Sequence, residues 1–354
     1  MAMPNVLMIG PSPDAMGGMA TVEKNILEAV RRRGDEAVFI STFEEGTKAK
    51  KLAVAAKAYM AFLRELRGCD LVHVHMASRG SYRRKKVFMD AAFRKKVPVV
   101  LHLHAGEFAL WFERECNDSQ RKEIRNTFHH CAGVIVLSEE WREYLLKEHV
   151  CNEDKLHVLH NAVPVPAQPY SPCSHQDVLF LGRLDANKSP DVLLRASRAM
   201  LKEHPEAKLL FGGDGYPERY EALACELGIA ERCEFLGWIA GEEKERLFER
   251  AGVYCLPSKN EGMPMSVLEA MARGIPTIAT PVGGVPQVIE DGVNGYLIPV
   301  DDEGRLTELL CMVLNNRGLR KEIGMAGRKT IIESFSIDRN VEELVRLYES
   351  VMHK

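Results

Sequence analysis

Short apolar runs alternate with amphipathic segments along the chain, and this alternation is completed once in each half. The runs are rich in Val, Ile and Leu and are too short for helices, which predicts buried strands of parallel sheets. Strands are expected at residues 5–10, 36–41, 70–75, 98–104, 133–138 and 156–163, and then at 178–182, 208–213, 233–239, 253–258, 276–280 and 295–300. Helices are expected after Gly18, at 48–67, from Ser189 or Pro190, at 217–227, 242–251, around 267–272, and at 303–315, 320–334 and 338–352. This order predicts the α/β class, with one Rossmann-like domain in each half.

A proline-rich segment separates the two halves. Residues 163–176 contain four prolines and few residues suited to a core, which is typical of an interdomain linker. A chain of 354 residues is also long for a single hydrophobic core. We therefore expect an N-terminal domain over residues 1–165 and a C-terminal domain over residues 176–337.

The composition predicts a soluble globular protein. Hydrophobic residues make up 46% of the chain and charged residues 27%, and no apolar run approaches the ~18 residues of a membrane span. The first residues have no basic segment ahead of an apolar one, so we expect no signal peptide. The nine cysteines show no C-x-x-C pair and no zinc-like spacing, which favours reduced thiols in the cytoplasm.

The formal net charge of −3 conceals an uneven distribution. Residues 1–170 hold 25 Lys and Arg against 21 Asp and Glu, a net +4, and the remainder holds 22 against 29, a net −7. Residues 48–96, which we call the basic belt, hold 14 basic and 3 acidic side chains. A belt of this charge suggests an anionic partner surface.

The first part of the basic belt, residues 48–67, has the pattern of an amphipathic helix. Its apolar stripe is expected to comprise Leu52, Ala55, Ala56, Tyr59, Met60, Leu63 and Leu66, and its polar side carries Lys50, Lys57 and Arg64. Two interpretations stay open: a surface helix with solvated lysines, and a helix that docks on anionic lipid headgroups.

The segment with the most informative chemistry follows the expected strand 253–258. Glu261 lies in the loop before a helix, and Glu269 lies about one turn inside it, with seven residues between the two. The N-terminus of a helix suits a phosphate, so two carboxylates there make sense if they bind hydroxyls, as on a sugar and a ribose. The alternative is that they are ordinary acids at the start of a helix.

Three further candidates lie where expected strands end. Gly17 and Gly18 precede a helix, where a backbone can approach a phosphate, although two glycines often mean only a turn. Arg183 and Lys188 flank a strand-to-helix loop and suit a diphosphate, although an isolated pair of cations in a loop is often merely exposed. His102 and His104 share one face of the strand 98–104, and His104 is nearer its carboxyl end, where α/β sheets bind ligands.

These motifs together resemble the retaining glycosyltransferases of family 4, which have the GT-B fold. The resemblance rests on the E-x7-E pair, on AMARGIPTIAT after it, and on GGVPQVIEDGVNGYLI. It implies two Rossmann-like domains facing across a cleft, with the helix in residues 338–354 crossing back to the N-terminal domain. It also implies that the N-terminal domain binds the acceptor and the C-terminal domain the nucleotide sugar.

The resemblance assigns roles to individual residues. Arg183 and Lys188 would neutralise the leaving nucleoside diphosphate, and Gly17 and Gly18 would lie opposite it. Glu261 would hold hydroxyls of the transferred sugar, Glu269 those of the ribose, and His104 would reach the sugar or the acceptor. The remaining donor-binding positions are Gly213, Gly262, Met263, Pro264 and Met265. Because the family's usual form after the first glutamate is E-G-F-G-L-P, Pro264 removes a backbone N–H and leaves the donor sugar open.

The expected reaction is transfer from a UDP-sugar, or next from GDP-mannose, to a saccharide or a polyprenyl-diphosphate-linked acceptor of cell-surface polysaccharide synthesis. The sequence has no D-x-D motif, so we expect no metal and no cofactor, and no nucleic acid partner. An anionic membrane surface, on the inner face of the plasma membrane, is a possible further partner. The alternatives are a hydrolysing nucleotide-sugar epimerase, a catalytically silent subunit, and a soluble synthase with a small acceptor.

Overall fold

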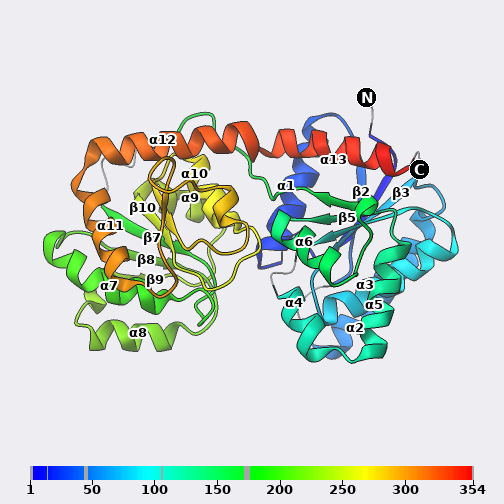
Figure 1. Cartoon of the computed structure of the whole chain (residues 1–354), viewed down its shortest axis with the longest axis horizontal. Coiled ribbons are helices and arrows are strands. Elements are labelled where there is room, and N and C mark those ends of the chain that lie inside the picture. The colour runs from blue at the N-terminus through cyan, green and yellow to red at the C-terminus, as the bar shows by residue number, and fades with distance from the viewer. Residues whose placement is uncertain (1–2, 14, 44–46, 105–106, 171–175, 353–354) are drawn as a thin grey trace. The chain divides into compact units, whose positions relative to one another are not determined.

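The computed structural model describes residues 3–13, 15–43, 47–104, 107–170 and 176–352, without the side chains of residues 48–52. The chain divides into two compact units, which are described one at a time. Unit 1 comprises Met1–Ala162 and Ile337–Lys354, and unit 2 comprises Val163–Ser336. Figure 1 shows a sheet flanked by helices in each of them.

Unit 1 contains a six-stranded parallel sheet in the order β2-β1-β3-β4-β5-β6. The strands are β1 Val6–Gly10, β2 Ala37–Ser41, β3 Leu71–Met76, β4 Val99–Leu103, β5 Gly133–Val136 and β6 Leu156–Val158. The helices of its N-terminal part are α1 Gly18–Arg32, α2 Lys48–Glu65, α3 Gly80–Arg94, α4 Phe108–Leu110, α5 Asp118–His130 and α6 Glu139–Lys147. A π-helical turn, Trp111–Glu115, and a 3-10 turn, Glu153–Lys155, complete this part.

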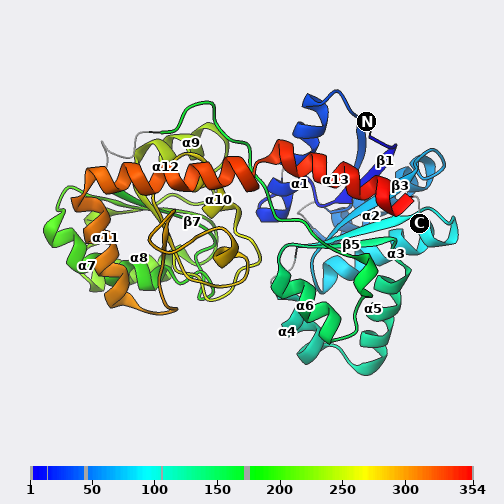
Figure 2. The ribbon, with the colours of Figure 1, turned by 45° about the horizontal axis from the view of Figure 1, so that its top comes forward.

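The C-terminal helix α13, Ile337–Met352, belongs to unit 1. Its apolar side chains Val341, Leu344, Val345, Tyr348 and Val351 are buried, as the stripe in the sequence predicted. Figures 1 and 2 show α13 beside α1. The return of the last helix to the N-terminal unit is therefore confirmed.

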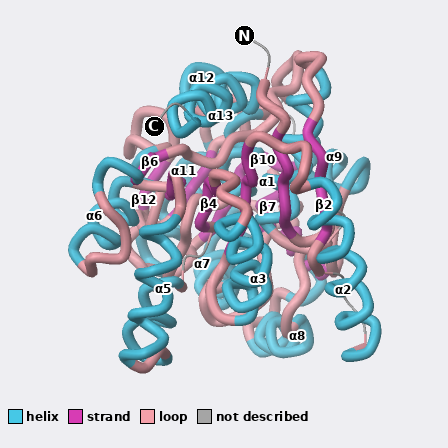
Figure 3. The backbone as a smooth tube through the Cα atoms, turned by 90° about the vertical axis from the view of Figure 1, so that its right-hand side faces the viewer, coloured by secondary structure: helices cyan, strands magenta, loops and turns pink. Residues whose placement is uncertain are grey.

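The two faces of the first sheet bury different side chains. Val72, Val74 and Met76 of β3 pack in one hydrophobic cluster with residues of α2, α3 and α5. Because side chains alternate along a strand, His73 and His75 point to the opposite face, where His73 meets Tyr348 of α13. Figure 3 shows α13 on one side of these strands and α2, α3 and α5 on the other.

Unit 2 contains a second six-stranded parallel sheet, in the order β12-β11-β10-β7-β8-β9. Its strands are β7 Asp177–Leu181, β8 Leu209–Gly212, β9 Cys233–Phe235, β10 Ala251–Leu256, β11 Thr277–Ala279 and β12 Tyr296–Leu297. Its helices are α7 Pro190–Glu203, α8 Pro217–Glu226, α9 Gly241–Arg250, α10 Met265–Ala272, α11 Glu303–Asn315 and α12 Arg317–Ser334, with 3-10 turns at Ala230–Arg232 and Val285–Gln287. Strand β10 lies in the middle of this sheet, between β7 and β11, so the loops after β7 and β10 are neighbours.

Some predicted boundaries are wrong. β9 ends at Phe235 and not at residue 239, because Gly237 has a φ of 67°, outside the strand region. α12 begins at Arg317 and not at residue 320, because the Asn316 side chain accepts a hydrogen bond from Leu319 N and caps it there. The described part of the proline-rich segment is held by unit 2, since Tyr170 N–H donates to Arg273 O.

The predicted apolar stripe of α2 is also wrong in part. Met60 is 68% exposed, whereas Phe62, which the stripe omitted, is fully buried. The side chains of Lys50 and Leu52 lie outside the described residues. Lys57 and Arg64 are exposed, as predicted for the polar side. Among the described residues, none of the helices combines the length and the apolar character that a membrane crossing needs.

Candidate active site

Lys188 and Glu261 form a close ion pair in unit 2. Lys188 Nζ lies 2.6 Å from Glu261 Oε1 and 2.7 Å from Oε2. Glu261 is in the loop between β10 and α10, and Lys188 is in the loop between β7 and α7. Only 6% of Glu261 is exposed, so its carboxylate has lost most of its water and depends on the lysine for charge compensation. The pairing of the two strands thus brings together residues 73 positions apart.

The β7–α7 loop is shaped by its own polar groups. Asp185 Oδ1 accepts hydrogen bonds from the backbone N–H groups of Asn187, at 3.0 Å, and Lys188, at 3.1 Å. Asn187 in turn bonds the neighbouring loop, because its carbonyl accepts from Lys259 N and its side chain donates to Asn260 O. These bonds fix the backbone from which Lys188 reaches Glu261.

Arg183 lies in the same loop but outside the ion pair. Its side chain is 55% exposed, and Nε lies 3.6 Å from Asp185 Oδ2. This is a loose contact that leaves the guanidinium open to solvent. Arg183 and Lys188, predicted to act together, therefore share a loop in this structure, but their charged groups contact different carboxylates, those of Asp185 and Glu261.

Glu269 is paired with a lysine that the sequence did not point to. Lys244 of α9 places Nζ 2.7 Å from Glu269 Oε1 and 2.6 Å from Oε2. The contact with Oε2 lacks hydrogen-bond geometry, so this buried oxygen has no hydrogen-bond partner among the described residues. Arg273 supports the same helix by donating to Glu269 O at 2.8 Å, while its other nitrogens bind Glu245. Lys244 lies in an acidic run of the sequence, where nothing marked it as a neighbour of Glu269.

The predicted glycine and loop positions are tightly packed. Gly213 has a φ of 157°, and a Cβ there would lie 1.9 Å from Gly182 O. Gly262 O accepts a hydrogen bond from Gly284 N at 2.6 Å. Met263, Pro264 and Met265 are buried, and Pro264 precedes the first turn of α10.

Gly283 is a position that the sequence left without a role. Its φ is 56°, and a Cβ would lie 2.0 Å from Glu261 O. Only a glycine lets the two backbones approach so closely. The GGVP segment is thus part of the wall behind Glu261.

In unit 1, Gly17 and Gly18 begin α1. Gly17 has a φ of 124° and accepts a hydrogen bond from Thr21 N. Behind this turn, the Glu23 carboxylate lies against Gly10, where a Cβ would be 2.0 Å from Glu23 Oε1. Neither Glu23 oxygen has a hydrogen-bond partner among the described residues, and burial raises the pKa of Glu23 to about 9.

Lys85 was counted in the basic belt, but it does not belong to an exposed charged surface. It is 1% exposed and donates to Thr42 Oγ1, and burial lowers its pKa to about 7. It is not available to an external anion in this structure. Arg79, also in the belt, is engaged by Glu107 and Glu115.

His104 follows β4 directly, as predicted. Its Nε2 lies 2.9 Å from His75 Nδ1, so one ring donates to the other. Burial lowers the pKa of His104 to about 3, which keeps the imidazole neutral. Ala105 and Gly106 of the predicted turn lie outside the described residues.

Comparison with known proteins agrees with this architecture. Residues 16–165 match the family described as Glycosyltransferase Family 4, and residues 171–330 match Glycosyl transferases group 1. An uncharacterized glycosyltransferase of Methanocaldococcus jannaschii is 29% identical over 285 residues, which are 73% of this chain and 70% of that protein. Several further relatives, at 32–34% identity, match this chain over less than half of their own length.

Solved structures of the same shape are more distant in sequence. Sucrose-phosphate synthase from Thermosynechococcus elongatus has a TM-score of 0.81 at 20% identity and covers 99% of both chains. The Anabaena protein HepE, in complex with UDP and glucose, has a TM-score of 0.77 at 16% identity and covers 98% of this chain and 100% of its own. The sequence matches in both halves and the shared fold show that the chain belongs to the family 4 glycosyltransferases of the GT-B fold.

Proposed function

We propose that the protein is a metal-independent, retaining hexosyltransferase that uses a nucleoside-diphosphate sugar, with a UDP-sugar preferred and GDP-mannose next. The observation that carries this proposal is the Lys188–Glu261 pair at the carboxyl end of the second sheet. It places a cation and a carboxylate side by side in the loops where α/β proteins bind nucleotides. In the bond that breaks, between the sugar and the diphosphate, Lys188 would act on the diphosphate and Glu261 on the sugar.

The cation would stabilise the leaving group. The bond between the anomeric carbon and the diphosphate oxygen breaks, and negative charge develops on that oxygen. An ammonium has three N–H donors, and Glu261 takes two of those of Lys188, which leaves one for a phosphate oxygen. The exposed Arg183 guanidinium, on the same loop, would add a second, bidentate contact.

The carboxylates would orient the donor. Glu261, already ionically paired, would accept hydrogen bonds from hydroxyls of the transferred sugar. Glu269 Oε2 is buried and has no hydrogen-bond partner in the described part of the chain, which suits a ribose hydroxyl. The acceptor hydroxyl would then bond to the anomeric carbon on the face that the diphosphate leaves, and its proton would pass to the departing phosphate.

UDP is the preferred nucleotide because HepE, which shares this fold, was crystallised with UDP and glucose. For the acceptor we propose a saccharide or a polyprenyl-diphosphate-linked saccharide of cell-surface polysaccharide synthesis, bound by unit 1. The exposed Lys57 and Arg64 favour contact with an anionic membrane surface. Lys85 contributes nothing to that contact, because it is buried.

A hydrolysing epimerase and a soluble synthase are the competing functions. An epimerase needs a base that removes a proton from the sugar, whereas both glutamates are bound to lysines here. A synthase with a small acceptor has support from the fold of sucrose-phosphate synthase alone. Its acceptor would be water-soluble and would not need anionic lipid.

The test is to incubate the purified chain with UDP-α-glucose and other nucleotide sugars in EDTA. Released UDP and the anomeric configuration of the product, including the product of slow transfer to water, are followed by NMR. We expect UDP together with an α-configured sugar. A β-configured first product would contradict retention, and an epimerised sugar without an acceptor would favour the epimerase.

A further inference from the structure

Three buried histidines of unit 1 lie together on one face of two neighbouring strands. His73 and His75 are alternate residues of β3, and His102 of β4 is paired in register with His75. Their exposed fractions are 0%, 0% and 2%. One ring nitrogen of each lies within 4.8 Å of one nitrogen of each of the others.

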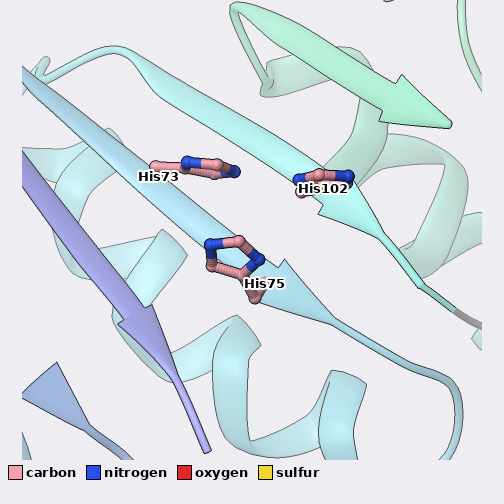
Figure 4. Close-up of side chains that lie close together, drawn as sticks. All are labelled: His73, His75 and His102. Carbon is pink, nitrogen blue, oxygen red and sulfur yellow. The ribbon is translucent and has the colours of Figure 1, made fainter. Parts of the chain in front are cut away.

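The rings are oriented edge to edge as well as face to face. Figure 4 shows the His73 and His102 rings with their edges toward one another and His75 beside them. The planes of His73 and His102 differ by only 9°, with their centroids 5.4 Å apart. The nitrogens of these two rings thus converge on the space between the strands.

Each of the three rings has a buried nitrogen with no hydrogen-bond partner among the described residues. These atoms are His73 Nε2, His75 Nε2 and both nitrogens of His102. Burying a polar atom without a partner costs free energy, so four such atoms in one place require an explanation. A ligand that accepts an electron pair from each of the three rings would supply it.

The other nitrogens of two rings are already held. His73 Nδ1 lies 2.6 Å from Tyr348 Oη of α13, and His75 Nδ1 lies 2.9 Å from His104 Nε2. A histidine that binds a metal has this arrangement: one nitrogen ligates, and the other donates a hydrogen bond that fixes the tautomer and the ring.

We propose that His73, His75 and His102 form a binding site for one divalent d-block cation, of which Zn²⁺ fits best. An all-imidazole set suits zinc, copper, nickel or cobalt and does not suit Mg²⁺ or Ca²⁺, which take oxygen ligands. Tetrahedral Zn²⁺ with bonds of 2.0–2.1 Å needs nitrogens roughly 3.3 Å apart. The nitrogens, now within 4.8 Å of one another, therefore approach by up to about 1.5 Å through rotation of the side chains, and a water takes the fourth position.

Such a cation would be structural. It would tie β3 to β4, and through Tyr348 it would strengthen the attachment of α13 to the sheet. It has no part in the proposed donor chemistry, which Lys188 and Arg183 support without a metal. The two proposals can accordingly fail separately.

The test uses the full chain, stripped with a chelator and then titrated with Co²⁺. We expect one equivalent to bind with the visible absorption of a tetrahedral site, to be displaced by Zn²⁺, and to raise the unfolding temperature. EDTA should lower that temperature without abolishing stabilisation by UDP. Absence of a stoichiometric Co²⁺ spectrum in the wild-type chain would overturn the proposal.

Variants locate the ion. His102→Gln should lose the equivalent, and Tyr348→Phe, which removes only the partner of His73 Nδ1, should weaken Co²⁺ binding about 10–100-fold. His204→Gln is the matched control. His204 of unit 2 is also buried, and its Nε2 has no hydrogen-bond partner in the described ranges, but it lies outside the cluster. If His102→Gln still binds one equivalent of Co²⁺, the metal belongs to other histidines and the proposed site is wrong. If His102→Gln does not fold, Tyr348→Phe decides: unchanged Co²⁺ affinity contradicts the proposal.

Discussion

Lys188 Nζ contacts both carboxylate oxygens of Glu261, at 2.6 and 2.7 Å, and so joins the loops that follow β7 and β10. The two side chains are 24% and 6% exposed, which makes this pair one of the more buried ion pairs of unit 2. In the function that we propose, a nucleotide sugar would meet a cation and a carboxylate that already lie in place. The proposed donor site would therefore be largely organised before the donor binds.

Replacing Lys188 with alanine should lower turnover by about 10²–10³, because the leaving diphosphate loses a charged donor. The buried Glu261 carboxylate is also left unpaired, so the free energy of unfolding should fall by roughly 3–5 kcal/mol. Steady-state kinetics and chemical denaturation measure the two effects.

The control for this variant is Lys208→Ala. Lys208 Nζ lies 2.8 Å from Glu234 but precedes β8, at the amino end of the strand and away from the donor loops. Turnover should stay near that of the wild type. Equal losses in Lys188→Ala and Lys208→Ala would remove the leaving-group role.

Replacing Lys244 with methionine should weaken UDP binding through the ribose. Lys244 Nζ contacts both carboxylate oxygens of Glu269, but only the contact with Oε1 is a hydrogen bond, so Oε2 is the oxygen we expect to accept a hydrogen bond from a ribose hydroxyl. Calorimetry should therefore show a loss of about tenfold for UDP and almost none for 2′,3′-dideoxy-UDP, because a net hydrogen bond to a charged group is worth ~1.5–3 kcal/mol. Arg246→Met, on the same helix with a loose contact to Glu242, is the control. A similar loss for both nucleotides would place Lys244 on the phosphates or in the fold alone.

Two glycine substitutions should differ in cost. Gly213→Ala combines a positive φ with a Cβ only 1.9 Å from Gly182 O, whereas Gly17→Ala has a positive φ but its Cβ meets no atom of the described residues within 4 Å. The second should cost about 1–2 kcal/mol of backbone strain, and the first clearly more. Thermal unfolding of both variants ranks them, and a smaller loss in Gly213→Ala than in Gly17→Ala would contradict the packing described.

Glu23→Gln should stabilise the protein more at pH 8 than at pH 5. The pKa of Glu23 is raised to about 9 in the fold from 4.5, so the folded chain keeps a proton that the unfolded chain loses as pH rises. The stability contributed by this group therefore falls with increasing pH between 4.5 and 9, by up to about 1.4 kcal/mol per pH unit. Glutamine carries no such proton and abolishes this slope. Denaturation at both pH values measures it, and an effect of Glu23→Gln independent of pH would show that Glu23 is ionised in the fold.

The sequence predicted the order of the strands and the helices of unit 2 well, because apolar runs and amphipathic periods are local signals. It predicted no helix at the places in unit 1 where the structure has α3, α5 and α6. It failed where a contact depends on the sheet order. Lys244 meets Glu269 only because α9 and α10 come together in unit 2, and no spacing in the sequence encodes that. The histidine cluster likewise depends on β3 and β4 being neighbours.

Local signals were also overridden by packing. The stripe predicted for α2 included Met60, which is 68% exposed, and omitted Phe62, which is fully buried. The error arose because apolar residues occur on more than one side of this helix. Lys85, counted as part of a charged surface, is buried beside Thr42. Charge counts do not tell which cations face solvent.

The most direct test of the proposed function is a calorimetric titration of UDP into the full chain in the presence of EDTA, with GDP in parallel. We expect one site per chain, with UDP bound more tightly than GDP and with affinity unchanged when Mg²⁺ or Mn²⁺ replaces EDTA. No binding of either nucleotide, or binding that appears only with a divalent cation, would contradict a metal-independent donor site built on Lys188, Glu261 and Glu269.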